Sequence, residues 1–317
     1  MIVYTLRRVA FALSLVWGAS FVAFVAFGLG FDPLWQFALC RPGCDPQRNA
    51  LIAQFHLHDP ILQRYWIWLT GLPRHGFGDA SVSQYRTHTT AIGPPLVHAA
   101  GVTAQLMAVG LVLTLVFSIA IGVVSARRGG PVDAVLRLLA YVSWSLPTFL
   151  TGVLLALWLF PTNWFFNGLS QGSGVMHWIR LMALPSVTLA LGLIGLYSRY
   201  VRSAMRSELR QPYAVVARGK GLSESRVVYR HVLRNSLVPF VSVLALDLGA
   251  VLGACFAAEW VFRLNGLATF FIGSMSNADP FVLTAIIAMV AVVVACFSIV
   301  TDLLVAWLDP RTVVALS

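Results

Sequence analysis

The sequence predicts an all-α, polytopic membrane protein with six transmembrane helices. Of its 317 residues, 58% are hydrophobic and 11% are charged, whereas about a quarter of the residues in soluble domains are charged. In lipid the backbone hydrogen bonds must be satisfied within the protein, which leaves helical bundles and closed barrels. Barrel strands alternate apolar and polar residues over about ten positions. The apolar runs of this chain are continuous and longer, so they predict helices.

Six runs approach the roughly 20 residues that cross a hydrocarbon core of about 30 Å. The first follows Arg7 and Arg8, and we interpret it as a retained anchor because it is longer than the apolar core of a secretory signal. The fourth is short, and Leu184-Pro185 near its start predicts a helix that begins there. The fifth is interrupted by Asp247. The six runs are Val9 to Gly30, Ala99 to Ala126, Leu138 to Phe160, Leu181 to Ser198, Asn235 to Ala258, and Phe281 to Thr301.

The basic residues predict the orientation of these spans. With a cytoplasmic N-terminus, fifteen Arg and Lys residues fall in the inner segments and two fall in the short outer loops, as the positive-inside rule requires. Both termini are then cytoplasmic. The chain divides into an N-terminal anchor with a long extracytoplasmic segment (1–98) and a five-helix core (99–317). Within the outer segment, Ile61 to Leu69 is either a short interfacial helix or a surface loop.

The formal charge of +10 does not indicate nucleic acid. The densest basic stretch, Arg199 to Arg234, lies between two apolar runs, where it faces lipid headgroups or a docking partner.

The four cysteines have no metal-binding spacing. Cys255 and Cys296 fall inside apolar runs and are interpreted as packing residues. Cys40 and Cys44 lie in the outer segment, where they form a local disulfide or remain two free thiols.

No pattern for catalysis is present. Gly219-Lys220 is followed by glycine rather than Ser or Thr, so the chain has no ATP-binding loop. Three acids lie in or at the edges of spans, where charge is costly and usually functional. Asp247, in the middle of a span, and Glu259 are candidates for a translocation pathway. Glu259 and Asp302 lie near span ends, where reaching water or an arginine is the alternative. An aspartyl dyad of Asp247 and Asp302 is a weak alternative, because their predicted depths differ.

The inner loop from residue 198 to 239 has a readable geometry. Pro212 opens a short helix that Gly219 and Gly221 end. Its residues Tyr213, Val216, Ala217 and Lys220 share one face. The loop is thus expected to present a compact knob.

A second helix follows the knob. Ser223 is its predicted N-cap and Glu224 lies in its first turn. Arg226, Arg230 and Arg234 form one stripe along it. A basic loop lying on anionic lipid explains this stripe but not the Ala/Gly spacing before it.

Residues Tyr213 to Pro239 resemble the cytoplasmic loop of dipeptide and oligopeptide ABC importer permeases, which have the type I importer permease fold. The resemblance extends over nearly the whole chain. It includes Leu6-Arg7-Arg8, Asp59-Pro60, Gly76-Phe77-Gly78, Ser145-Leu146-Pro147, Leu184-Pro185-Ser186, Glu259 with Gly266-Leu267, Asp279-Pro280, Asp302-Leu303-Leu304, and Leu308-Asp309-Pro310-Arg311.

The resemblance implies that the loop is a coupling helix that docks on a separate ATPase subunit. Ala217 and Gly221 would be the close-approach positions, with Arg218 and Lys220 as flanking contacts. Val215 stands where the broader importer motif has an acid, which weakens an acid-mediated contact there. The complete implied site is Tyr213, Val216, Ala217, Arg218, Gly219, Lys220 and Gly221.

The resemblance also implies the partners. These are a second homologous permease, identical or different, two ATPase subunits or a fused pair that bind ATP and Mg²⁺, and an extracytoplasmic substrate-binding protein in a bacterial inner membrane. No cofactor is expected in this chain. Peptide is the expected substrate, with nickel chelates, glutathione and haem left open. An ion-coupled secondary transporter or channel and an intramembrane aspartyl enzyme are the alternative classes.

Overall fold

The computed structural model describes residues 2–34, 45–80, 91–159, 174–277 and 279–308. Throughout these ranges the regular structure is helical, apart from an isolated antiparallel bridge between Asp79 and Ala91. Cys40 and Cys44 lie outside the described residues. Cys255 is buried, as predicted for a packing residue, but Cys296 is exposed.

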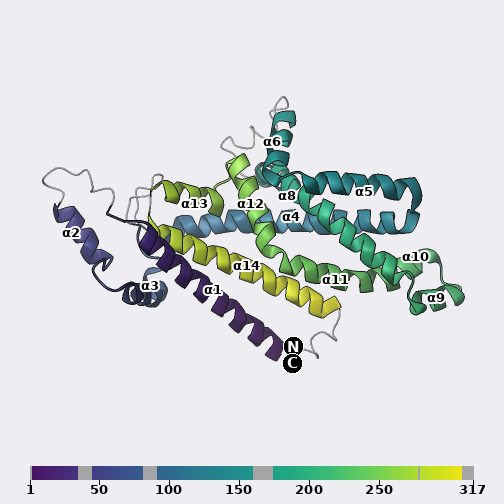
Figure 1. Ribbon diagram of the computed structural model, residues 1–317, viewed down its shortest axis with the longest axis horizontal. Helices are drawn as coiled ribbons and strands as arrows, with labels where there is room; N and C mark the ends of the chain where they lie inside the picture. Colours follow the sequence, from purple (N-terminus) through teal and green to yellow (C-terminus); the bar gives the residue numbers. More distant parts are fainter. Residues whose placement is uncertain (1, 35–44, 81–90, 160–173, 278, 309–317) are drawn as a thin grey trace. The chain divides into compact units, whose positions relative to one another are not determined.

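The chain is a succession of helices (Figure 1). Four of them are long and apolar enough to cross a membrane: Leu6–Gly30, Gly93–Arg128, Val175–Glu208 and Pro280–Trp307. The six predicted spans are obtained when each of two bent helix pairs counts as one crossing. The helices are α1 (Ile2–Gly30), α2 (Asp45–Gln54), α3 (Ile61–His75), α4 (Gly93–Arg128), α5 (Gly130–Ser145), α6 (Thr148–Leu159), α8 (Val175–Glu208), α9 (Pro212–Gly219), α10 (Glu224–Arg226), the π-helix η3 (Val227–Val232), α11 (Leu233–Leu246), α12 (Leu248–Phe262), α13 (Leu267–Ser276) and α14 (Pro280–Leu308).

The third predicted span is not one straight helix. The axes of α5 and α6 differ by 102°. Leu146 between them is extended, with φ −83° and ψ 125°, because a residue before proline is pushed out of the helical region and Pro147 follows. Hydropathy reports the apolar length of this segment but not its change of direction.

The fourth predicted span is longer than expected. Helix α8 begins at Val175 rather than near Pro185, which lies inside the helix and is buried. The prediction of a helix entry at Pro185 is therefore wrong. A proline inside an apolar helix is tolerated where neighbouring elements satisfy the freed backbone groups.

The chain forms two compact units. The first contains Thr103–Arg263 with short pieces of α1 and α14, and the second contains Arg7–Val102 with Leu264–Ala295. In the first unit α8 packs against α5, α6, α11 and α12, and Figure 1 shows α5 beside it.

Glycines allow the helices of the first unit to approach closely. A Cβ on Gly195 of α8 would lie 2.5 Å from the carbonyl oxygen of Ala140 and 2.8 Å from the amide nitrogen of Trp144, both on α5. A Cβ on Gly122 of α4 would lie 2.6 Å from Val201 of α8. Small residues serve this purpose in membrane helix pairs, so α4, α5 and α8 form tight seams.

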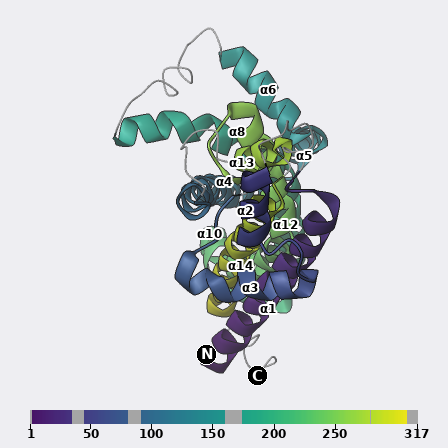
Figure 2. The same cartoon turned by 90° about the vertical axis from the view of Figure 1, so that its left-hand side faces the viewer.

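In the second unit α3 runs across α1 (Figure 2). Tyr65 is buried against Phe21 and Phe24 of α1, with ring centroids 5.1 Å and 5.5 Å apart. Its hydroxyl lies 3.0 Å from that of Ser20. The segment predicted as a helix or a loop is thus a helix, and one that packs on the anchor. The next residue, Trp66, is exposed.

Candidate functional site

The short helix α9 follows the end of α8, as Figure 1 shows. It begins at Pro212 and ends at Gly219, which confirms both predicted boundaries. Gly221 has a φ of 78°, a left-handed conformation that residues with a Cβ rarely adopt. The chain reverses there because this conformation ends the helix. Local sequence alone is sufficient to form this turn.

The outer face of α9 is apolar and uncovered. Val215 and Val216 are 57% and 55% exposed, whereas Ala214, on the inner side of the helix, is fully buried. Lys220 is exposed, and no atom lies within 4 Å of a Cβ placed on Gly219 or Gly221. The surface over these glycines is open to a closely approaching partner.

The four residues predicted to share one face of α9 differ in their exposure to solvent. Val216 and Lys220 are exposed, while Tyr213 and Ala217 are half-buried. The Tyr213 hydroxyl donates a hydrogen bond of 2.5 Å to Glu208, at the end of α8. Burial, assisted by this bond, raises the pKa of Tyr213 to about 12. The phenol therefore remains a donor at neutral pH and ties α9 to α8.

Arg218 is occupied within the loop. Its guanidinium donates to both carboxylate oxygens of Glu224, at 2.9 Å and 3.0 Å, and to the carbonyl of Leu209 at 3.2 Å. This bidentate arrangement fixes the turn between α9 and α10. The resemblance assigns Arg218 to a partner contact, which stays a prediction, and within this chain the same side chain braces the loop.

The helix that follows begins at Glu224, with Ser223 in the N-cap position as predicted. The Ser223 side chain makes no capping hydrogen bond. The helix includes a π turn, η3, whose Val227, Val228 and Val232 are all fully buried. The three arginines of the predicted stripe, Arg226, Arg230 and Arg234, are exposed.

A buried aspartate, Asp133, lies in the first turn of α5. Asp133 is 4% exposed. Arg202 on α8 donates to both of its oxygens, at 2.6 Å and 2.7 Å, and Arg206 donates at 2.9 Å. Ser125 on α4 also donates to it. Together with Arg137, 3.5 Å away on α5, these residues form what we name the Asp133 cluster.

Asp133 is not among the site residues predicted from the sequence. One signal was present: Asp133 is the single acid in the stretch from Arg127 to Arg137, and Arg137 follows it at the i+4 spacing of a helical ion pair. Its main partner, Arg202, is 69 positions away. The pairing therefore depends on how α5 and α8 pack.

The acids predicted inside spans have hydroxyl donors. Asp247 lies at the break between α11 and α12, where the axes bend by 62°, and accepts a hydrogen bond of 3.1 Å from Tyr197. Glu259 on α12 is fully buried and accepts one of 2.5 Å from Thr103. Asp302 is half-buried on α14.

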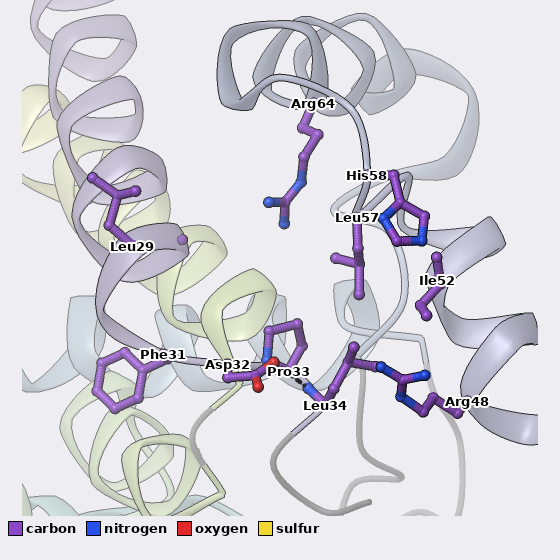
Figure 3. A pocket seen from close by; sticks show the side chains of 11 residues that line it. Leu29, Phe31, Asp32, Pro33, Leu34, Arg48, Ile52, Leu57, His58 and Arg64 are labelled. Carbon is purple, nitrogen blue, oxygen red and sulfur yellow. Dashed lines mark hydrogen bonds between the residues drawn. The ribbon is translucent and has the colours of Figure 1, made fainter. Parts of the chain in front are cut away.

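The second unit contains a pocket of about 330 Å³ between the end of α1, α2 and α3 (Figure 3). The apolar part of its lining includes Leu29, Ile52 and Leu57. Arg64 of α3 points into the pocket. Burial lowers the pKa of Arg64, against the opposing charge of Asp59. In the described part of the chain, no three His, Cys, Asp or Glu residues come together as a metal site.

Helices long and apolar enough to cross a membrane, with the exposed helix α9 between them, fit a membrane transport subunit. The model of the family described as "binding-protein-dependent transport system inner membrane component" matches residues 118–314, and the chain belongs to this family. It is an inner-membrane permease subunit that works with ATPase and substrate-binding partners, and it is not itself an enzyme.

Curated relatives match nearly the whole chain. The oligopeptide transport system permease protein OppB of Mycobacterium tuberculosis is 32% identical over 97% of this chain and 98% of its own length. The oligopeptide transport system permease protein AppB of Bacillus subtilis is 28% identical over 98% and 99%. The dipeptide transport system permease protein DppB of Lactococcus lactis is 29% identical over 98% and 99%.

Proposed function

We propose that this permease belongs to an ATP-driven importer of dipeptides or oligopeptides. The observation that carries the proposal is the similarity over nearly the full chain to permeases named for oligopeptide and dipeptide transport. In this proposal, residues 99–317 form half of the translocation path and a second homologous permease forms the other half. An extracytoplasmic protein delivers the peptide, and both chain termini are cytoplasmic.

Helix α9 is proposed as the surface that docks on one of two ATPase subunits, where ATP and Mg²⁺ bind. The exposed Val216 and Lys220 and the open surface over Gly219 and Gly221 support this role. Tyr213, Ala217 and Arg218 complete the proposed coupling site, Tyr213 and Arg218 through the bonds that hold α9 in place.

Asp247 and Glu259 are proposed to line the translocation path. Both are carboxylates among apolar helices, and both accept hydrogen bonds from hydroxyl groups. At Asp247 the bond from Tyr197 reaches one carboxylate oxygen and leaves the other able to accept a further bond. Such a group is suited to contact a passing ammonium or amide.

The docking role is tested with Gly221→Leu in the assembled importer. We expect uptake and substrate-stimulated ATP hydrolysis to be lost while the permease still inserts, because the side chain occupies the surface where the ATPase approaches. Gly221→Asn separates bulk from backbone strain, since asparagine tolerates the left-handed conformation and should still impair uptake.

Gly78 provides the matched control, because its φ is 80° and a Cβ there also meets no atom within 4 Å. Gly78→Leu introduces the same strain far along the chain from α9 and should leave ATP coupling intact. Normal uptake by Gly221→Leu would refute the docking role.

The orientation is tested with reporters fused after Gly30 and after Gly130. One crossing separates the two positions in the proposed topology, so the reporters should show opposite sidedness. Alkaline phosphatase is active only outside the cytoplasm, and its activity at the two sites is the measurement. The same sidedness at both positions would contradict the proposal.

A further inference from the structure

We propose that Asp133 is a positioning residue that transmits movement of the docking helix α9 to the helices α4 and α5. This inference rests on the proposed function of α9. It assigns a role in energy coupling to a residue that lies outside the docking surface and outside the proposed translocation path.

The Asp133 cluster joins three helices through one carboxylate. Asp133 belongs to α5, Ser125 donates to it from α4, and Arg202 and Arg206 donate from α8. Both carboxylate oxygens accept a guanidinium hydrogen bond, and charge-assisted pairs of this geometry are strong and directional. Because Asp133 is buried, solvent screens these bonds much less than it screens a surface salt bridge.

The covalent link between α4 and α5 leaves their angle weakly fixed. The two helices are joined through Gly129 and Gly130, whose φ values are 59° and 58°. Glycines are conformationally permissive, and no atom lies within 4 Å of a Cβ placed on either of them. The side-chain bonds from Ser125 to Asp133 therefore supply the constraint that this turn lacks.

The arginines that bond Asp133 lie on α8, a few residues before the positions that α9 contacts. Arg206 is two residues before Glu208, which accepts the hydrogen bond from Tyr213 of α9. Arg218 of α9 bonds the carbonyl of Leu209, the residue that follows α8. A displacement of α9 is thus applied to the last turn of α8, which carries Arg206, and Arg202 lies about one turn before it.

A contiguous chain of hydrogen bonds of this kind can carry a coupling energy between two sites. In its presence α4, α5 and the end of α8 move together when α9 moves. In its absence the end of α8 moves without α4 and α5, and ATP hydrolysis is no longer converted into rearrangement of the helices.

The experiment compares Asp133→Asn with the unchanged permease in the complete importer, reconstituted with its ATPase and binding protein. Three quantities are measured: co-purification of the ATPase, the basal and substrate-stimulated rates of ATP hydrolysis, and peptide uptake. We expect the complex to assemble and hydrolyse ATP, with the peptide uptake per ATP reduced about tenfold, within the usual range of coupling energies.

Two further variants test the same cluster. Asp133→Glu keeps the charge and should restore most of the uptake per ATP. Ser125→Ala removes the donor on α4 and leaves the ion pairs between α5 and α8. It should therefore reduce the peptide uptake per ATP less than Asp133→Asn does. Asp59→Asn is the control substitution, because Asp59 is a partly exposed acid that pairs with His56 at 3.4 Å.

The outcomes separate the inference from the proposed function. A wild-type ratio of uptake to ATP hydrolysis in Asp133→Asn overturns the positioning role, and so does a loss of uptake that only follows a loss of assembled complex. If the unchanged complex shows no ATP-dependent uptake, the proposed function fails, and this inference fails with it.

Discussion

Asp133 and Asp247 are both aspartates at helix breaks in the same compact unit, and their surroundings differ. Asp133 is buried and receives the guanidinium groups of Arg202 and Arg206. Asp247 is half-buried and receives the phenol of Tyr197. A carboxylate paired with several cations is held in one position, whereas one bonded to a hydroxyl can accept another donor. The first environment suits a mechanical link and the second suits a transient contact.

Glu259 belongs with Asp247 in this comparison. It is fully buried and accepts a hydrogen bond from the Thr103 hydroxyl. All three acids lie beside or within apolar runs of the sequence. Position in the sequence therefore does not distinguish Asp133 from Asp247. The groups that donate hydrogen bonds to them in the structure do.

The largest expected effect comes from breaking the seam that holds the Asp133 cluster together. In Gly195→Ala the new Cβ would collide with backbone atoms of Ala140 and Trp144, which cannot move without shifting α5. We expect a loss of about 2 kcal/mol of stability, as for other overpacked sites, and a lower unfolding temperature of the purified permease.

Gly253→Ala is the control for this prediction. Gly253 lies in α12, where no atom comes within 4 Å of a Cβ, and alanine is the better helix former by about 1 kcal/mol. The unfolding temperature should stay the same or rise. Equal destabilisation by the two substitutions would show that the α5–α8 seam is not the sensitive contact.

The smallest expected effect on stability comes from neutralising the hydroxyl-bonded acids. Asp247→Asn and Glu259→Gln keep the size of each side chain and its ability to accept from Tyr197 or Thr103. For Asp247→Asn the stability change should remain below about 1 kcal/mol, the net value of one hydrogen bond. A role in the path predicts a higher KM for peptide uptake with little change in uptake per ATP, measured in the reconstituted importer.

That pattern is the reverse of the one expected for Asp133→Asn. A raised KM with unchanged coupling for Asp247 and Glu259, against lost coupling for Asp133, would sharpen the distinction between the two regions. Lost coupling at all three positions would remove it.

Local signals in the sequence predicted the bounds of α9 well. Pro212 fixes the start of α9 and Gly219 and Gly221 fix its end, because the backbone preferences of these residues operate without help from the rest of the fold. The position of Ser223 at the start of the next helix was predictable for the same reason.

Hydropathy predicted the apolar segments but not their paths. It measures how much apolar surface a run contains, so it could not show the turn between α5 and α6 or the early start of α8 at Val175. Pro147 was a visible signal for the first of these. The early start of α8, which places Pro185 and Arg180 within the helix, had no comparable local signal.

The sequence by itself determined the membrane class of the protein, its family and the local shape of the loop that contains α9, because composition, apolar length and turn residues act over short stretches of chain. Only the tertiary structure decided that Asp133 meets Arg202 and Arg206 while Asp247 meets Tyr197. Asp133 and Arg202 are 69 positions apart, and the close approach of α5 and α8 at Gly195 brings their helices together. Such a pairing depends on packing and not on any local pattern.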